Sequence, residues 1–338
     1  MTSNHRYFIS EYADDYFFHG GIGIVDAERI LKNNGFKPIK LPYQYSFSAW
    51  AKISRAWFCL KLIFSIDRKA TIVFIHPLHA TLNNWLARRL ALSGRKVICM
   101  IGDINGLKDG DSLLLEKEVK QLKTFKNFIV HNQQMQDWLN KLIPRNESAA
   151  IDFFDFLAPV ATSTRSKDDM VVFAGNLDKS KFLQDLGKLP LRFRIYGPGI
   201  SHAMLEQPNV EYLGVIDPYE LPGKLSGSFG LVWDGESTEE MKGSLGHYMQ
   251  FISHHKISLY ILAGLPIIIA CNAGGAPLVN KHRIGICVNS LSEIPNRIHS
   301  LTAIEYEEMI NNMKPLAREI AKGNCLSSAL DRLLKRLD

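Results

Sequence analysis

The feature that most constrains the fold is a regular alternation of short, apolar, β-branched runs with longer stretches of helical periodicity. In the first half, strands are expected at 6–10, 37–41, 71–76, 96–101 and 127–131. Helical stretches at 24–34, 81–93 and 132–142 separate them. This alternation predicts parallel sheets with helices on both faces, a doubly wound α/β architecture.

The alternation stops once, at a polar segment that contains Pro159, and then restarts. A chain of 338 residues has the length for two domains of about 150 residues each. We therefore expect an N-terminal domain at 1–157, a linker at 158–169, a C-terminal domain at 170–322, and a final helix at 323–338 that can pack back on the N-terminal domain. Further strands are expected at 170–174, 191–196, 210–213, 230–233, 266–270 and 284–288, and helices at 178–187, 218–226, 255–263, 291–300 and 303–322.

Composition and charge exclude several classes of function. The net charge of +6 suits an anionic ligand such as a nucleotide diphosphate, or an anionic membrane surface. Nucleic acid is not expected, because the basic residues form no stripe interleaved with aromatics. Five scattered cysteines without a C-x-x-C pair indicate a reducing compartment, so we expect a cytoplasmic protein that could work at the inner face of the membrane.

Two apolar stretches bear on membranes. Residues 257–280 carry no charge, but glycines and prolines interrupt them, which favours a buried helix and strand over a membrane span. Residues 51–66 are apolar with Lys52, Arg55 and Lys61, so they fit either a helix lying on a membrane surface or a packed helix with a solvated basic face.

A glycine-rich loop follows the first strand, with Gly20, Gly21 and Gly23 before a helix. Glycines allow close backbone approach, and a helix N-terminus favours negative charge, so we assign them to the acceptor side of a ligand cleft. The alternative is a structural turn. Asp26 occupies the third glycine position of a dinucleotide fingerprint, which argues against a nicotinamide cofactor and so against an epimerase or dehydrogenase.

Asp103 directly follows the strand expected at 96–101. A carboxylate at the carboxyl end of a strand, beside a cleft, can take a proton from an attacking hydroxyl. The alternative is an aspartate that caps the next turn. Asp109 and Asp111 form a D-x-D pattern that fits a turn and a helix N-cap better than a metal site, so we expect no metal and no other cofactor.

The second domain offers two cations near expected helix starts. Gly175 and Asn176 form a turn before Lys179, and Lys256 begins a mostly apolar helix. A helix N-terminus disfavours a cation, and an anionic ligand between Lys256 and the helix would resolve that conflict. The alternative is a surface lysine whose aliphatic part packs on the helix while its ammonium extends into solvent.

Several of these segments together resemble a known family. Residues 230–235, the run Lys256-x-Ser258-Leu259-Tyr260 and Leu265-Pro266 resemble the bacterial β-1,6-galactofuranosyltransferases of O-antigen assembly, as do shorter runs at 130–132, 155–157 and 174–177. More distantly, residues 229–233 and the helix from Lys256 are similar to the streptococcal glucosyltransferases that extend GlcNAc on serine-rich adhesins.

The resemblance implies a GT-B fold, in which two Rossmann-like domains face each other across a cleft. It also implies inverting, metal-independent transfer of a sugar, most readily galactofuranose, from a UDP-sugar to a hydroxyl of a glycan acceptor that can be lipid-linked. Asp103 aligns with a family aspartate, although Gly102 replaces the histidine that usually precedes it. Donor-binding residues are expected to be Gly175, Asn176, Lys179, Gly214, Asp234, Tyr248, Lys256 and Ser258.

Two alternative functions stay open at this stage. One is a glucosyltransferase of the same fold that acts on a glycoprotein or polysaccharide. Another is a degenerate subunit that binds a glycan or a partner without catalysis. Contact with a membrane surface and self-association into a homo-oligomer also stay open.

Overall fold

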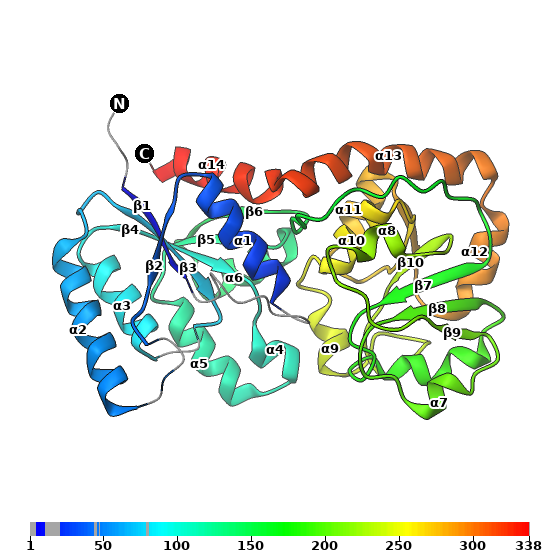
Figure 1. Cartoon of the computed structure of the whole chain (residues 1–338), viewed down its shortest axis with the longest axis horizontal. Helices are drawn as coiled ribbons and strands as arrows, with labels where there is room; N and C mark the ends of the chain where they lie inside the picture. The colour runs from blue at the N-terminus through cyan, green and yellow to red at the C-terminus, as the bar shows by residue number, and fades with distance from the viewer. Residues whose placement is uncertain (1–4, 11–20, 44–45, 47, 79–80, 338) are drawn as a thin grey trace.

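The computed structural model describes residues 5–10, 21–43, 46, 48–78 and 81–337. They form two lobes side by side, each built on a six-stranded sheet (Figure 1). Every strand pair in both sheets is parallel. The expected pair of doubly wound α/β domains is therefore confirmed.

The N-terminal sheet has the strand order β2-β1-β3-β4-β5-β6. Its central strand β3 is buried along its whole length and β4 at every residue but Lys96, as expected of parallel strands covered on both faces. The strands are β1 Arg6–Ser10, β2 Lys37–Lys40, β3 Thr71–His76, β4 Lys96–Ile101, β5 Asn127–Val130 and β6 Glu147–Ala150. The helices are α1 Ile22–Asn33, α2 Ala49–Ser65, α3 Thr81–Leu92, α4 Asn105–Asp109, α5 Ser112–Leu122 and α6 Gln133–Leu142.

Side-chain caps start several of these helices, as the sequence predicted. The Asn132 side chain accepts the backbone N–H of Met135 at the start of α6. Asp111 accepts the N–H of Leu114 at the start of α5, after Gly110 with φ 69°. The D-x-D pattern is thus a turn and an N-cap in this fold, as expected.

The C-terminal sheet has the order β12-β11-β10-β7-β8-β9. The strands are β7 Met170–Ala174, β8 Arg192–Tyr196, β9 Val210–Tyr212, β10 Phe229–Val232, β11 Ile267–Ala270 and β12 Gly285–Val288. The helices are η1 Lys181–Lys188, α7 His202–Leu205, α8 Leu221–Lys224, α9 Gly243–Tyr248, α10 His255–Ala263, α11 Ala276–His282, η2 Leu291–Glu293, α12 Ile294–Ser300 and α13 Ala303–Lys322.

Some expectations differ from the structure. The helix expected at 178–187 is a 3₁₀ helix, η1, and the one expected at 218–226 shortens to α8. The uncharged stretch at 257–280 forms most of α10, then β11 and the start of α11, with Gly264 ending α10 at φ 67°. Within the described ranges, no helix combines the length and the apolar character needed to cross a bilayer.

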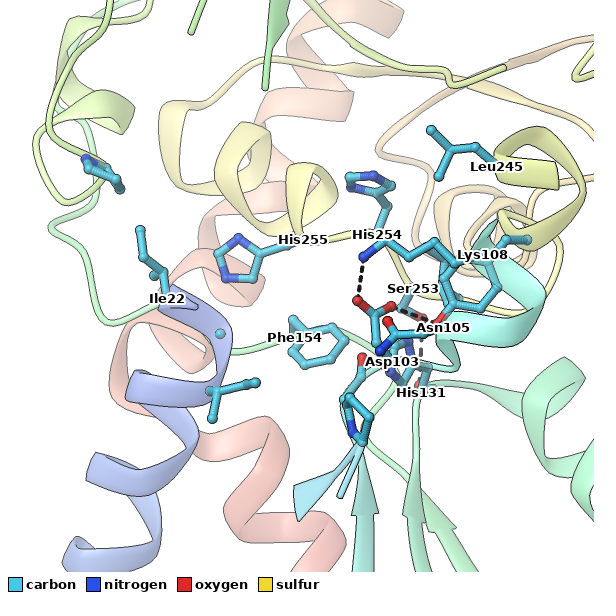
Figure 2. A pocket seen from close by; sticks show the side chains of 17 residues that line it. Ile22, Asp103, Asn105, Lys108, His131, Phe154, Leu245, Ser253, His254 and His255 are labelled. Atoms are coloured by element: carbon cyan, nitrogen blue, oxygen red, sulfur yellow. Dashed lines mark hydrogen bonds and ion pairs between the residues drawn. The ribbon is translucent and has the colours of Figure 1, made fainter. Parts of the chain in front are cut away.

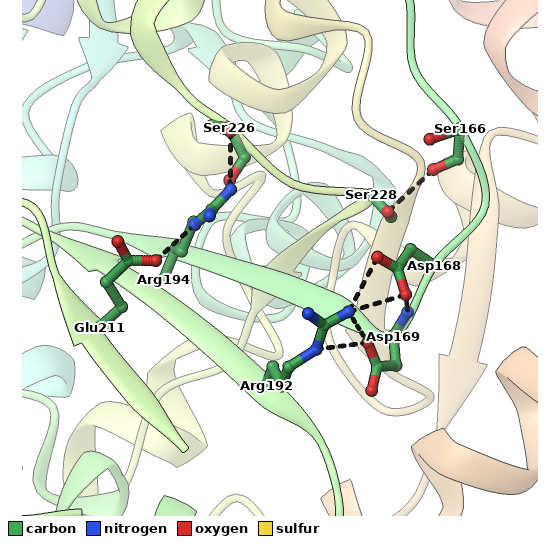
Figure 3. A network of polar contacts seen from close by, with 8 residues as sticks. All are labelled: Ser166, Asp168, Asp169, Arg192, Arg194, Glu211, Ser226 and Ser228. Carbon is green, nitrogen blue, oxygen red and sulfur yellow. Dashed lines mark hydrogen bonds and ion pairs between the residues drawn. The ribbon is translucent and has the colours of Figure 1, made fainter. Parts of the chain in front are cut away.

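The chain crosses between the two lobes twice. Residues 158–169 carry it into the C-terminal lobe, where Arg192 pairs with Asp168 and Asp169 and fixes the end of the linker (Figure 3). Near the C-terminus, α13 ends at Gly323 and α14, Asn324–Leu337, lies along the N-terminal lobe (Figure 1).

The second crossing is tightly packed. The buried face of α14, which includes Leu326, Leu330 and Leu333, shares a core with strands of the N-terminal sheet. The Asp155 carboxylate accepts the N–H groups of Cys325 and Leu326 at 3.1 and 2.7 Å, so it caps the free amides of α14. A side chain at position 323 would press on Ile30 of α1 at 2.5 Å, and only glycine fits there.

A candidate active site between the two domains

A cavity of about 540 Å³ lies between the two domains (Figure 2). Its N-terminal wall comes from the start of α1 and from the loops after β3, β4 and β5, at the carboxyl ends of those strands. Its C-terminal wall comes from α9 and from the residues that lead into α10. The lining residues are 22–24, Pro77, Gly102, Asp103, Asn105, Lys108, His131, Phe154, Pro218, Leu245, Tyr248 and 252–255.

Asp103 is the one acidic residue that lines this cavity within the described part of the chain. Its side chain is 34% exposed, and Oδ2 lies 2.6 Å from Nζ of Lys108. Oδ1 accepts the hydroxyl of Tyr248 at 2.7 Å. The carboxylate is therefore held from two sides and still open to the cavity, an arrangement suited to a general base.

Tyr248 brings the C-terminal domain onto Asp103. Its ring is buried, and its oxygen also accepts the N–H of Ile104 at 2.8 Å. Burial, together with the nearby Asp103 carboxylate, raises the pKa of Tyr248 well above its ordinary value, so the phenol stays protonated and donates. The sequence placed Tyr248 on the donor side, whereas here its hydroxyl contacts the candidate base.

His131 supports the backbone just behind Asp103. Its Nε2 donates to the carbonyl oxygens of Ile101 and Gly102, at 3.0 and 3.1 Å. Burial lowers the pKa of His131 to about 4, so the ring is neutral. A Cβ on Gly102 would lie 3.0 Å from the carbonyl oxygen of His76, which leaves little room for a larger residue there.

A second, buried cluster lies in the C-terminal domain around Asp234, just after β10. Its Oδ2 lies 2.9 Å from Nζ of Lys256 and 3.1 Å from Nε2 of His254, and Oδ1 accepts the hydroxyl of Ser180 at 3.0 Å. Burial alone would raise the pKa of Asp234, but Lys256 and His254 hold it well below its ordinary value. The cluster thus contains a stable carboxylate–ammonium pair.

The two lysines assigned to the donor diphosphate have different surroundings. Lys256 is 8% exposed, and its ammonium lies 4.5 Å from the centre of the Phe173 ring. A Cβ on Gly175 would come within 2.8 Å of its Cε, so the glycine makes room for the lysine. Lys179 is exposed, at a turn where Asn176 accepts its backbone N–H at 3.3 Å. Lys256 is therefore buried and paired with Asp234, whereas the sequence predicted an anionic ligand or solvent beside its ammonium.

The other predicted site residues are spread more widely. Ser258 is fully buried and donates to the carbonyl oxygen of Phe154 at 2.5 Å, so its hydroxyl joins the two domains. Gly214 follows β9 at φ 81° and accepts the N–H of Gly197 at 2.9 Å. Gly21 is the N-cap residue of α1 and Gly23 lines the cavity. Gly20 lies outside the described residues.

Three residues of this region were not assigned a role from the sequence. Lys108 was seen only as the flank of the D-x-D turn, although it stands five residues after Asp103 on the short helix α4. His131 follows β5, so its place at a strand's carboxyl end was a usable signal. His254 caps α10 through Nδ1, and burial followed by the charge of Lys256 lowers its pKa.

The two facing α/β domains have the GT-B fold, which solved structures of glycosyltransferases share. The lipopolysaccharide glycosyltransferase WaaG matches over 96% of this chain and 98% of its own, with a TM-score of 0.53 and 12% identity. An E. coli structure described as trehalose-6-phosphate bound with UDP-2-fluoro glucose matches over 97% and 98%, with a TM-score of 0.59 and 12% identity.

Sequence comparison narrows the class to a family. The glucosyltransferase 3-like N-terminal domain matches residues 6–142, and the C-terminal domain of the same family matches residues 171–333. The chain therefore belongs to the glucosyltransferase 3-like glycosyltransferases.

Two curated relatives have different sugar specificities. The β-1,6-galactofuranosyltransferase WbbI of Escherichia coli K12 is 28% identical over 282 residues, which cover 80% of this chain and 81% of the relative. Glucosyltransferase 3 of Streptococcus gordonii is 30% identical over 118 residues, which cover 35% of this chain and 34% of the relative.

Proposed function

We propose that this glycosyltransferase transfers galactofuranose, with inversion and without a metal, from its UDP-sugar to a hydroxyl of a cell-surface glycan. The relative WbbI, which matches four fifths of the chain, supports the choice of sugar. A structural neighbour with a bound UDP-sugar analogue supports the choice of nucleotide.

The observation that carries the proposal is the carboxylate of Asp103 in the interdomain cavity, beside Lys108 and Tyr248. In the proposed step, Asp103 accepts the proton of the acceptor hydroxyl while that oxygen bonds to the anomeric carbon. The bond from the anomeric carbon to the diphosphate breaks on the opposite face, and UDP leaves with the electron pair. Attack from that face inverts the anomeric configuration.

The leaving diphosphate needs stabilisation on the C-terminal side. An ammonium has three N–H donors, and Asp234 and the Phe173 ring occupy only part of the surroundings of Lys256. We assign the rest of that ammonium, the backbone N–H groups at the start of α10 and the exposed Lys179 to the diphosphate. The Asp234 pair then keeps Lys256 charged and in place.

The Asp103→Asn variant tests the proposal. We expect its turnover to fall on the order of 10²–10⁴-fold, because an amide cannot take the proton, while its affinity for UDP stays within about threefold. Turnover is measured with radiolabelled UDP-galactofuranose and a glycan acceptor, and UDP binding by calorimetry.

Three results would contradict the proposal. The first is near-normal turnover of the Asp103→Asn variant. The second is a product whose anomeric proton shows retained configuration by NMR. The third is turnover that disappears with EDTA and returns with a divalent cation, because the diphosphate would then depend on a metal.

A second candidate is transfer of glucose, which the S. gordonii relative and the family description favour. A panel of UDP-galactofuranose, UDP-galactopyranose and UDP-glucose at equal concentration separates the two. We expect the highest kcat/KM with the furanose. UDP binding without turnover on any donor would instead favour a subunit that binds glycans without catalysis.

A further inference from the structure

Helix α2 presents a stripe of large apolar side chains to solvent. Trp50, Ile53, Trp57, Leu60 and Phe64 are exposed by 67%, 61%, 61%, 41% and 87% of their surface. They are spaced three, four, three and four residues apart, so they fall on one face of the helix. Aromatic side chains that are mostly exposed in such a row mark an interaction surface.

The stripe is separate from the core-facing side of the same helix. Ala51 and Cys59 are buried, and Phe58, Leu62 and Ile63 pack against the N-terminal core. The helix is therefore attached to its domain mainly through residues outside the stripe. Exposed side chains of this size lower the solubility of a protein and do not stabilise its fold. We therefore expect another molecule to cover them.

Charge identifies the kind of partner. Neither α2 nor the adjacent α3 contains an acidic residue, and the pair carries Lys52, Lys61, Arg88 and Arg89 as exposed cations. Within the described residues none of these four forms an ion pair, and the Lys61 ammonium lies 5.7 Å from the Trp57 ring centre. Asp67, beyond the end of α2, is engaged by His5.

We propose that the α2 face binds an anionic lipid surface. Aromatic and branched side chains would enter the boundary between headgroups and acyl chains, while the flanking lysines and arginines pair with anionic headgroups. The proposal is independent of the sugar that the enzyme transfers. Figure 1 places α2 at the end of the N-terminal lobe remote from the C-terminal lobe, so docking leaves both walls of the interdomain cavity uncovered.

A second copy of the chain fits the same face less well. The three-four spacing matches a coiled-coil seam, but such seams are flanked by residues of opposite charge that pair between helices. With no acidic residue on α2, two copies would place lysines against lysines. A bilayer with negative headgroups meets the stripe and the cations at once.

Vesicle co-sedimentation of the full chain tests the proposal. We expect binding to vesicles of phosphatidylglycerol and phosphatidylethanolamine at least about tenfold stronger than to pure phosphatidylcholine, and weaker at high salt. The triple variant Trp50→Ser, Trp57→Ser, Phe64→Ser should lose at least about tenfold of that binding. The double variant Leu113→Ser, Ile304→Ser removes two side chains that are 78% and 73% exposed on other helices, and should bind like the unmodified chain.

The fold of the triple variant is checked by its melting temperature and UDP affinity, which should both match those of the unmodified chain. Equal vesicle binding by the triple variant and the unmodified chain would overturn the proposal. So would absence of binding to anionic vesicles. A dimer in sedimentation equilibrium that becomes a monomer in the triple variant, without vesicle binding by either, would assign the face to self-association.

Discussion

Each half of the molecule contains an aspartate paired with a lysine just after a central strand, and the two pairs differ in burial. Asp103 and Lys108 follow β4, with side chains 34% and 30% exposed at 2.6 Å. Asp234, which follows β10, pairs with Lys256 at 2.9 Å, with side chains 5% and 9% exposed. The two aspartates thus hold equivalent positions, each two residues after the fourth strand of its domain, but in different settings.

This difference in burial bears on what each ion pair can do. An exposed pair can exchange its partners for substrate at little cost, because water already screens the charges. A buried pair cannot lose a partner without leaving an uncompensated charge in a medium of low polarity. This contrast supports the roles proposed above, which are proton transfer for the N-terminal pair and a fixed charge near the diphosphate for the C-terminal pair.

The largest expected effect is on the buried pair. Lys256→Met keeps the apolar stem and removes the charge, which leaves Asp234 buried with only His254 and Ser180 as partners. We expect a loss of about 3–5 kcal/mol in the free energy of unfolding. Urea unfolding followed by circular dichroism measures it. A loss below about 1 kcal/mol would show that the two pairs are energetically alike.

The next effect concerns pH, through the buried histidines around the cavity. Burial lowers the pKa of both His131 and His255 to about 4, so the unfolded chain takes up their protons first as pH falls. Stability should therefore drop between pH of about 6.5 and about 4, by on the order of 3 kcal/mol for each histidine. The buried Asp234 pair contributes little in this window, since that carboxyl ionises well below its ordinary pKa.

One carboxyl opposes that trend. Burial raises the pKa of Asp155 to about 6, so the folded protein takes up this proton before the unfolded chain does. Its contribution to stability rises as pH falls from about 6 to about 4. In Asp155→Asn the acid-side drop should be steeper than in the unmodified chain, as measured by the melting temperature against pH. A shallower drop would contradict the assignment.

Tyr248→Phe tests the contact that the C-terminal domain makes with the exposed pair. Hydrogen bonds to charged groups contribute about 1.5–3 kcal/mol, so turnover should fall roughly ten- to a hundredfold. The affinity for UDP should stay close to normal, because the lost hydroxyl contacts Asp103 and Ile104. Weakened UDP binding with unchanged kcat would return Tyr248 to the donor side, as the sequence first suggested.

The smallest stability effect is expected at the exposed pair. Lys108→Met should change the free energy of unfolding by less than about 1 kcal/mol, because exposed ion pairs contribute little. It is the matched control for Lys256→Met, with the same substitution at the same kind of pair. A loss as large as that of the buried variant would remove the distinction drawn here.

Much of the fold could be predicted because apolar, β-branched runs strongly favour buried strands over other secondary structure. The strands β1, β3, β4 and β7 have the predicted bounds, as do helices α10 and α13. Strand β6 was missed, since its sequence Glu-Ser-Ala-Ala has no β-branched residue and gains its strand form from pairing with β5. Helix α9 was missed because it contains two glycines.

The site was less predictable, because its contacts join residues far apart in the chain. The place of Asp103 followed from the end of β4, a local property. The contact of Tyr248 with Asp103 spans 145 positions, and the pairing of Lys256 with Asp234 depends on how α10 packs on β10. The local periodicity of the sequence predicts neither of these two contacts.

The double crossing of the chain sets how the enzyme can open. The linker at 158–169 and the junction at Gly323 attach the C-terminal lobe at two points, so relative motion of the lobes is favoured as rotation about the line that joins them. Asp103 belongs to the N-terminal lobe and Tyr248 to the C-terminal lobe, so such a rotation would change the distance between them. A swing wide enough to admit an acceptor would part the Tyr248 hydroxyl from the Asp103 carboxylate, and the return swing would restore that contact. Under the proposed role of Asp103, proton transfer would then follow closure.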